Sequence, residues 1–152
     1  MGLQVKDVMS KEVKSISPDI NAKDALKILI ESDMSGLPVI DRDGRLVGVF
    51  TEREILKTIL PVYVKDVGTF IYANDSKSEL KKLASVEKFL VRDLMRKDVP
   101  TIDEEASLTE TSKIMLTKSE RRIVVMKNNR PVGIVTRNDV VRALAQKAGV
   151  TL

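Results

Sequence analysis

The chain has 152 residues, of which 43% are hydrophobic, 32% charged and 3% aromatic, and its formal net charge is +4. This length suits one globular domain or two small ones, and the apolar content is sufficient for a buried core. The sequence contains no cysteine and no histidine. It therefore excludes disulfides, thiolate metal sites, cysteine nucleophiles and the Ser-His-Asp triad, and it predicts no metal centre.

Basic and acidic residues are interspersed along the chain. This distribution predicts a solvated mixed-charge surface rather than the concentrated basic stripe of nucleic-acid-binding proteins. No apolar run approaches the roughly 18 residues of a membrane span, and the first residues lack the apolar core of a signal peptide. We therefore expect a cytoplasmic protein without a membrane partner.

The sequence carries an internal duplication. Val5–Met9 returns as Val91–Met95, 86 positions later, and Leu46–Thr51 returns as Pro131–Thr136, 85 positions later. The second copy is thus one residue shorter, and the match between the intervening strands places the lost residue near Thr117. Such self-similarity predicts two copies of one structural unit.

The first copy predicts five elements. An extended piece is followed by a helix whose apolar residues recur at helical spacing, by two strands joined through a tight turn, and by a second helix. In chain order these elements cover Val13–Ser17, Ala22–Ile30 with Asn21 as N-cap, Leu37–Ile40, Leu46–Phe50 and a helix that opens at Thr51.

The second copy predicts the same order, with Ser107 and Glu110 as a capping pair. The fold class is therefore mixed α/β (α+β), with two β-α-β-β-α repeats. We expect the repeats to be related by pseudo-twofold symmetry, with their sheets packed together, helices outside, and clefts between them. The further elements of this copy are Val99–Asp103, Ile123–Met126, Val132–Val135 and a helix that opens at Thr136.

Residues 61–90 separate the two repeats, which span 1–60 and 91–150. Pro61 ends the preceding helix, Val62–Val64 and Phe70–Tyr72 are apolar, and Ser78–Leu90 predicts a helix. Two interpretations stay open for this segment. It is a linker packed on the repeats, or it is a partner or dimer surface, because aromatic and β-branched residues cluster in it.

Each repeat has a Thr where its second strand meets its second helix, and an acidic residue three positions later. These pairs are Thr51 with Glu54 and Thr136 with Asp139. One interpretation is a helix cap that needs no ligand, which suits Glu54 better than Asp139 because Glu is the residue of the capping-box pattern. The other is nucleoside binding. A helix N-terminus attracts phosphate, a carboxylate can accept from both ribose hydroxyls, and the glycine three positions before each Thr leaves room beside the backbone.

The repeated pattern resembles a tandem pair of CBS (cystathionine-β-synthase) domains, or Bateman module, of the stand-alone type. The resemblance implies a non-catalytic regulatory or energy-sensing module that binds an adenosyl ligand (AMP, ADP, ATP or S-adenosylmethionine) without an obligatory cofactor. It also implies a homodimer that signals to an effector protein in trans. The segments that carry the resemblance are Val5–Met9, Ser15–Pro18, Ser35–Asp41, Gly48–Glu54, Val91–Met95, Thr101–Ile102, Ile123–Val125 and Gly133–Asp139.

In the proteins that the chain resembles, each cleft takes its Thr and acid from one repeat and its base-contacting residues from the other. The resemblance assigns Thr136 and Asp139 of the first cleft to the ribose, with Arg137 and Asn138 as phosphate contacts. Small residues on the other side admit a flat base, and strand backbone near Ile16 bonds the base edge. The residues assigned to this base side are Ser15, Ile16, Ser17, Ser35, Gly36 and Pro38.

The second cleft departs from the family pattern. Glu54 is one methylene longer than the Asp expected there, and Glu120–Ile123 replaces the expected small residue and Pro. We expect this cleft to be weak or empty, with its arginines binding phosphate or filling the space with positive charge. The residues assigned to it are Thr51, Glu54, Thr101, Ile102, Arg121, Arg122 and Ile123.

The alternative function is a nucleic-acid-binding adaptor that uses the scattered Arg and Lys side chains. It predicts steep salt dependence without nucleotide specificity. An enzyme is not expected, because one carboxylate in each cleft supplies no acid–base pair.

Overall fold

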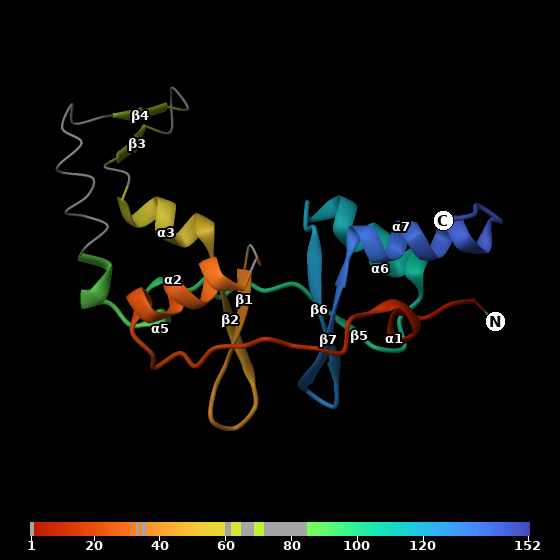
Figure 1. Cartoon of the computed structure of the whole chain (residues 1–152), viewed down its shortest axis with the longest axis horizontal. Coiled ribbons are helices and arrows are strands. Elements are labelled where there is room, and N and C mark those ends of the chain that lie inside the picture. The colour runs from red at the N-terminus through yellow and green to blue at the C-terminus, as the bar shows by residue number, and fades with distance from the viewer. Residues whose placement is uncertain (1, 33, 35, 60–61, 65–68, 72–84) are drawn as a thin grey trace. The chain divides into compact units, whose positions relative to one another are not determined.

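The computed structural model describes all residues except 1, 33, 35, 60–61, 65–68 and 72–84, which Figure 1 draws as a thin grey trace. The chain divides into two compact units. The first-repeat unit comprises Ser15–Arg42 and Val47–Lys97. The second-repeat unit comprises Met1–Lys14, Asp43–Leu46 and Asp98–Leu152.

The first-repeat unit contains a two-stranded sheet, β1–β2, and an antiparallel pair, β3–β4. As predicted, Asn21 caps α2, because its Oδ1 accepts a hydrogen bond from the N–H of Lys23 at 2.8 Å. The elements are α2 (Ala22–Glu31), β1 (Gly36–Ile40), β2 (Leu46–Thr51), α3 (Glu52–Ile59), β3 (Val62–Val64), β4 (Thr69–Ile71), the 3-10 helix η1 (Ser85–Lys88) and α5 (Val91–Leu94).

The second-repeat unit contains a three-stranded sheet of order β5-β6-β7, in which β5 runs parallel and β7 antiparallel to β6. Ser107 caps α6 as predicted, because its Oγ accepts from the N–H of Glu110 at 3.1 Å. Figure 1 shows these elements in cyan and blue, with α1 in red. They are α1 (Val5–Val8), β5 (Thr101–Asp103), α6 (Leu108–Thr117), β6 (Arg122–Lys127), β7 (Arg130–Thr136) and α7 (Arg137–Lys147).

The mixed α/β fold class is confirmed, with small sheets and helices in both units. The two copies differ in their first extended piece. In the second copy it forms strand β5, whereas residues 13–17 of the first copy form only an isolated parallel bridge, between Ile16 and Val39. None of the described helices is long and apolar enough to cross a membrane.

The short helix α1 opens the first sequence copy but packs on elements of the second. The N–H of Val5 donates to the carbonyl of Ala106 at 2.9 Å. Ser10, just after the helix, exchanges two hydrogen bonds with Ile134 of β7, each 2.9 Å long. The leading segment of the first copy therefore completes the unit of the second copy.

The converse holds for α5, which opens the second sequence copy and packs in the first-repeat unit. The N–H of Val91 donates to the carbonyl of Ile20 at 3.0 Å, and Arg96 exchanges two 2.9 Å hydrogen bonds with Val49 of β2. The compact units thus differ from the sequence copies by a reciprocal exchange of their leading segments, and Asp43–Leu46 of the first copy also falls in the second-repeat unit.

A glycine in each second strand makes this exchange sterically possible. A Cβ at Gly133 would lie 2.7 Å from the carbonyl oxygen of Ser10, and a Cβ at Gly48 would lie 2.8 Å from that of Arg96. Both glycines are buried. The room expected beside them for a ligand is therefore occupied by the exchanged segments, and that interpretation of the two glycines is wrong.

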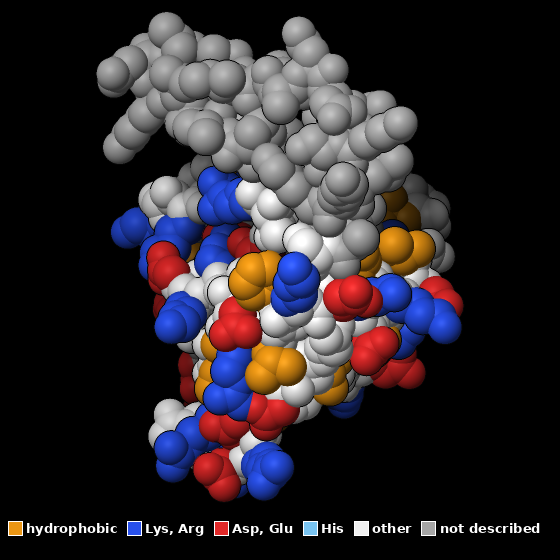
Figure 2. All heavy atoms as spheres, turned by 90° about the vertical axis from the view of Figure 1, so that its left-hand side faces the viewer, with side chains coloured by type: hydrophobic (Ala, Val, Ile, Leu, Met, Phe, Trp, Pro, Cys, Tyr) orange, Lys and Arg blue, Asp and Glu red, His pale blue; other side chains and the backbone are white. Residues whose placement is uncertain are grey.

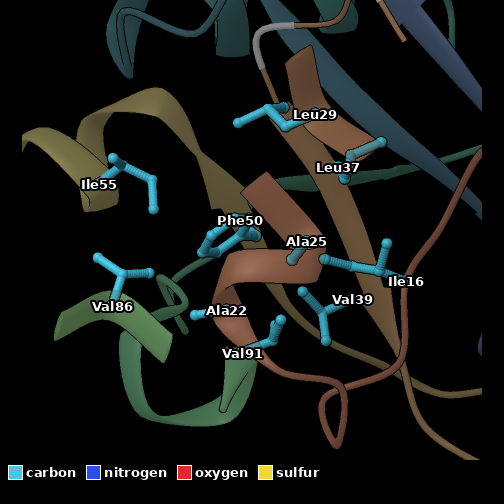
Figure 3. Close-up of a cluster of buried hydrophobic side chains, with 10 residues drawn as sticks. All are labelled: Ile16, Ala22, Ala25, Leu29, Leu37, Val39, Phe50, Ile55, Val86 and Val91. Atoms are coloured by element: carbon cyan, nitrogen blue, oxygen red, sulfur yellow. The ribbon is translucent and has the colours of Figure 1, made fainter. Parts of the chain in front are cut away.

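A buried apolar cluster holds the first-repeat unit together, with the fully buried Phe50 of β2 among its members. Ala22, Ala25 and Leu29 join it from α2, because positions three and four apart lie on the same side of a helix. Figure 3 shows their side chains with those of the strands and of α5. The cluster consists of Ile16, Ala22, Ala25, Leu29, Leu37, Val39, Phe50, Ile55, Val86 and Val91.

The strand register corrects the position of the residue that the second copy lacks. Ile16 pairs with Val39, and Ile102, 86 positions after Ile16, pairs with Val125, 86 positions after Val39. The offset of 86 therefore persists through β6, and the residue is lost in the following hairpin turn rather than near Thr117. The physical reason is a tighter turn in the second copy, where residues 128 and 129 have φ of 51° and 63°.

Parts of the predicted linker lie outside the described residues, among them Pro61, Tyr72 and most of the helix expected over Ser78–Leu90. At the described end of that helix, Ser85–Lys88 forms η1 instead, with Val86 buried in the apolar cluster. The apolar stretch Val62–Val64 pairs with Thr69–Ile71 as β3–β4.

Candidate functional site

The turn Thr136–Asp139 begins α7 with a reciprocal pair of hydrogen bonds. The N–H of Asp139 donates to Oγ1 of Thr136 at 3.1 Å, and the N–H of Thr136 donates to Oδ2 of Asp139 at 2.9 Å. Both side chains are half-buried. Among the described residues, the Thr136 hydroxyl proton has no acceptor and Oδ1 of Asp139 has no donor. The cap therefore leaves one donor and one acceptor at a helix N-terminus for a ligand.

The turn Thr51–Glu54 begins α3 with similar residue types, but its side chains bond to one another. We call such a turn closed. The backbone N–H of Thr51 donates to Oε2 of Glu54 at 3.2 Å, and the Thr51 hydroxyl donates to the same oxygen. The Thr51 hydroxyl also accepts from the N–H of Arg53 at 3.1 Å. Glu54 is only 6% exposed. The hydroxyl is thus used as both donor and acceptor, and the carboxylate is buried.

Acid and threonine side chains take part in capping at both turns, as the ligand-free interpretation predicts. The expectation that Glu54 suits a capping box better than Asp139 is wrong, because the reciprocal box forms at Thr136–Asp139. The extra methylene lets the Glu54 carboxylate reach the Thr51 hydroxyl, whose lone pairs then face the N–H of Arg53.

The residues assigned to the base side of the first cleft meet at the bridge between Ile16 and β1. The N–H of Ile16 donates to the carbonyl of Pro38 at 3.0 Å, and the carbonyl of Ile16 accepts from the N–H of Ile40 at 3.0 Å. The backbone groups of Ile16 itself are therefore used by the sheet. Because successive residues of an extended segment alternate, the backbone groups of Ser15 and Ser17 face away from β1.

The remaining residues of this base side differ in their surroundings. Gly36 is buried, and a Cβ there would lie 2.9 Å from Cγ2 of Thr51, so the strand approaches that side chain closely. Pro38 is buried, while Oγ of Ser17 accepts from the N–H of Asp19 at 3.1 Å. Ser35 lies outside the described residues.

The residues assigned to the second cleft from the second repeat lie on β5, β6 and the loop before β6. Ile102 and Ile123 are buried in the apolar core and present only backbone to a ligand. Thr101 and Arg121 are exposed, and Arg122 is half-buried. Arg122 lies directly opposite Thr136 in the β6–β7 register, so the two side chains share a face of the sheet.

The corrected offset of 86 changes which residues of the two repeats correspond. Arg121 and Arg122 are the counterparts of Ser35 and Gly36, and Val124 is the counterpart of Pro38. Sequence reasoning missed Val124, which is buried at 6% exposure. The shorter Asn-Asn turn was the signal that could have placed the lost residue correctly.

Arg137 and Asn138, the expected phosphate contacts, are both exposed at the first turn of α7. The guanidinium of Arg137 is held by the protein, because its Nε donates to the carbonyl of Glu120 at 3.0 Å and its Nη2 to that of Met115 at 3.4 Å. Two of its donors are therefore used within the second-repeat unit.

We also looked beyond the two turns for a basic nucleic-acid-binding surface and for a metal-binding group of acidic side chains. In Figure 2, basic and acidic side chains are interspersed over the visible face, without a concentrated basic stripe. Within the described part of the chain, no three acidic side chains gather in a group that could hold a metal ion.

A family model described as CBS domain matches the chain twice, over residues 5–61 and 91–146. Among curated proteins, the chain is similar to the uncharacterized protein MJ1426 of Methanocaldococcus jannaschii. The two are 29% identical over 153 residues, which cover 92% of this chain and 90% of that protein.

Two solved CBS-pair structures with bound ligands are also similar. CBSX2 from Arabidopsis thaliana in complex with AMP is 29% identical, with a TM-score of 0.73 over 97% of this chain and 99% of that one. The CBS domain pair of MJ0100, in complex with 5′-methylthioadenosine and S-adenosyl-L-methionine, is 26% identical, with a TM-score of 0.67 over 97% and 99%. The chain belongs to the CBS domain family, as a pair of CBS repeats.

Proposed function

We propose that this CBS pair is a non-catalytic regulatory module that binds an adenosyl ligand through the turn Thr136–Asp139. In this proposal the Asp139 carboxylate accepts hydrogen bonds from the ribose hydroxyls, and the Thr136 hydroxyl donates to ribose or phosphate. The ligand class comprises AMP, ADP, ATP and S-adenosylmethionine.

The observation that carries the proposal is the pair of unused groups at this turn. Capping the helix needs only two acceptors, Oδ2 of Asp139 and a lone pair of Thr136 Oγ1. Both already accept hydrogen bonds from backbone N–H groups of the turn. The Thr136 hydroxyl proton and Oδ1 of Asp139 remain for a ligand at a helix N-terminus, where the dipole favours a phosphate.

The base side of the ligand is assigned by resemblance to the first repeat. The backbone groups of Ser15 and Ser17, which face away from β1, support this assignment, because an adenine edge needs one donor and one acceptor. Gly36 and Pro38 carry no polar side chain and suit an apolar ring face. Ile16 holds this segment in place through its buried side chain, and Ser35 belongs to the same assignment.

The ligands of similar proteins support the same class. AMP is bound in the CBSX2 structure, and 5′-methylthioadenosine and S-adenosyl-L-methionine are bound in the MJ0100 structure. All three carry an adenine and a ribose and differ in the group at the 5′ position. We therefore expect adenosine recognition to be shared and the 5′ group to distinguish ligands.

A thermal-shift panel with AMP, ADP, ATP, S-adenosylmethionine, NAD and GTP tests the proposal. A ligand at 100 times its dissociation constant stabilises the folded state by about 2.7 kcal/mol. Asp139→Ala is expected to abolish this shift while lowering the unliganded stability by about 1 kcal/mol, the usual size of a cap loss.

Asp24→Ala is the matched control for this experiment. Asp24 lies three residues after the N-cap Asn21, the same helical position that Asp139 holds after Thr136, but it is exposed on α2. The control should keep the ligand-induced shift. If no adenosyl ligand shifts the wild type, the turn serves only as a cap. If RNA or DNA gives the only shift and salt removes it, the adaptor function replaces this one.

Homodimerisation and signalling to an effector protein in trans are part of the same proposal. Exposed apolar side chains on the helices support a dimer, since Ile30 of α2 is 69% exposed and Leu116 of α6 is 75% exposed. Sedimentation equilibrium measures the dimer, and Ile30→Glu should weaken it. A cytoplasmic location remains an expectation from the sequence.

A further inference from the structure

The loop between α6 and β6 has a backbone conformation that its sequence does not favour. Helix α6 ends at Thr117, and the N–H of Glu120 donates back to the carbonyl of Met115 at 3.0 Å. Ser119, between them, has a φ of 52°. This is the Schellman arrangement, in which the left-handed position normally carries glycine because a Cβ is disfavoured there. The loop therefore needs support from outside itself.

Arg137 supplies that support from the first turn of α7. Its Nε donates to the carbonyl of Glu120 at 3.0 Å, and its Nη2 donates to the carbonyl of Met115 at 3.4 Å. Its backbone N–H donates to the carbonyl of Arg121 at 2.9 Å. The Arg137 side chain thus joins the end of α6 to the loop, on both sides of the strained serine.

We propose that Arg137 is a positioning residue, which sets the loop 118–121 for the ligand-binding turn beside it, rather than a phosphate ligand. Charged donors to carbonyls make stronger hydrogen bonds than neutral ones, so the guanidinium holds the loop in place. Arg137 follows Thr136 directly, and the loop leads into Arg122, which lies opposite Thr136 in the sheet. Arg137 therefore fixes the neighbours of the proposed ribose-binding pair.

The first repeat lacks such a side chain at the corresponding place. Glu52 is the counterpart of Arg137, 85 positions earlier, and it is exposed on α3. A carboxylate has no N–H to donate to carbonyl oxygens. Positioning by a guanidinium is therefore a property of the second repeat, the one that carries the open turn.

Hydrogen exchange of the backbone amides tests the effect on the loop without any ligand. In Arg137→Ala, the amide of Glu120 should exchange about tenfold faster, because loss of a charge-assisted clamp makes local opening easier. Arg137→Lys should not restore protection, because one ammonium cannot bond both carbonyls at the guanidinium positions. Ser119→Gly in the Arg137→Ala background should restore it by removing the strain. Arg142→Gln, which removes an exposed charge from the same helix, should leave exchange unchanged.

Titration with adenosine and with AMP separates positioning from phosphate binding, and this part rests on the proposed function. In Arg137→Ala both ligands should lose affinity by the same factor, about fivefold, because the phosphate makes no contact with Arg137. Recovery of both affinities in the Ser119→Gly double variant is the readout that a direct ligand contact would not give.

The outcomes distinguish a failure of the positioning role of Arg137 from a failure of the proposed ligand-binding function. Unchanged exchange at Glu120 in Arg137→Ala overturns the positioning role, whether or not a ligand binds. A loss confined to AMP, rescued by lysine, shows a phosphate ligand instead. If the wild type binds neither adenosine nor AMP, the proposed function fails while the exchange experiment still decides the role of Arg137 in the loop.

Discussion

The turns Thr51–Glu54 and Thr136–Asp139 occupy equivalent positions in the two repeats, and after the shared threonine all three residues differ, with Glu54 in the place of Asp139. In the first, the longer carboxylate accepts the hydroxyl proton of Thr51 and is buried. In the second, the shorter carboxylate accepts only a backbone N–H, and the Thr136 hydroxyl proton is not used among the described residues. The two turns therefore differ in whether the threonine hydroxyl proton is already bonded within the turn or is left for a ligand.

The largest losses of stability are expected at the two buried glycines, where both repeats pack a second strand against an exchanged segment in the same way. Gly48→Ala and Gly133→Ala each place a Cβ within 2.8 Å of a carbonyl oxygen of an exchanged segment. We expect each to lower the free energy of unfolding by about 3 kcal/mol, as overpacking does when backbone must move. Urea unfolding measures both values. If one variant is tolerated, the repeats differ in their scaffold and not only in their turns.

Removal of the carboxylate should cost more stability at the closed turn Thr51–Glu54 than at the open turn Thr136–Asp139. Glu54→Ala leaves the N–H and hydroxyl of Thr51 without their buried acceptor and should cost about 2 kcal/mol. Asp139→Ala, at a half-buried cap, should cost about 1 kcal/mol. Both values come from urea unfolding without ligand. Equal losses would contradict the difference in burial between the two turns.

Asp139→Asn should sharpen the comparison by weakening ligand binding while keeping the cap. The amide oxygen can still accept from the N–H of Thr136, so unliganded stability should change by less than about 0.5 kcal/mol. One acceptor of the carboxylate becomes a donor, and AMP affinity should fall about tenfold, or about 1.4 kcal/mol. Isothermal titration calorimetry measures the affinity, and unchanged affinity would show that Oδ1 of Asp139 is not a ligand contact.

Glu54→Asp should change the free energy by less than the affinity loss expected for Asp139→Asn, and it tests whether the closed turn can be opened. The shorter side chain cannot reach the Thr51 hydroxyl, so about 1 kcal/mol of stability should be lost with that bond. The free hydroxyl then matches the one on Thr136, and a second equivalent of AMP should bind per chain. Calorimetric stoichiometry checks this. If it stays the same, the arginines of the second cleft, and not Glu54, keep that cleft empty.

Local structure could be predicted from local pattern. The spacing of Ala22, Ala25 and Leu29 gave the buried face of α2, although Ile30 of the same pattern is 69% exposed. Asn21 and Ser107 gave the starts of two helices. The exchange of leading segments could not be predicted in this way. An apolar residue such as Val5 must be buried, but its pattern does not say which of two similar copies buries it.

In the candidate site, too, local pattern predicted some features and not others. The Thr-x-x-acid spacing located both turns, because capping and nucleoside binding require the same residue types at the same helix terminus. The direction of each hydroxyl depends on the reach of one side chain and could not be read from the spacing. The left-handed Ser119 gave no signal either, because serine is common in loops and only the backbone shows its strain.

The exchanged leading segments have a consequence for how the chain can be divided. A cut in the segment between the two sequence copies would give two fragments, each carrying a piece of the other's unit. Neither fragment would carry its whole unit, because Ser10 bridges to Ile134 and Arg96 bridges to Val49 across the cut. The two fragments should therefore complement each other when mixed, and the covalent connection serves to keep them at a high effective concentration.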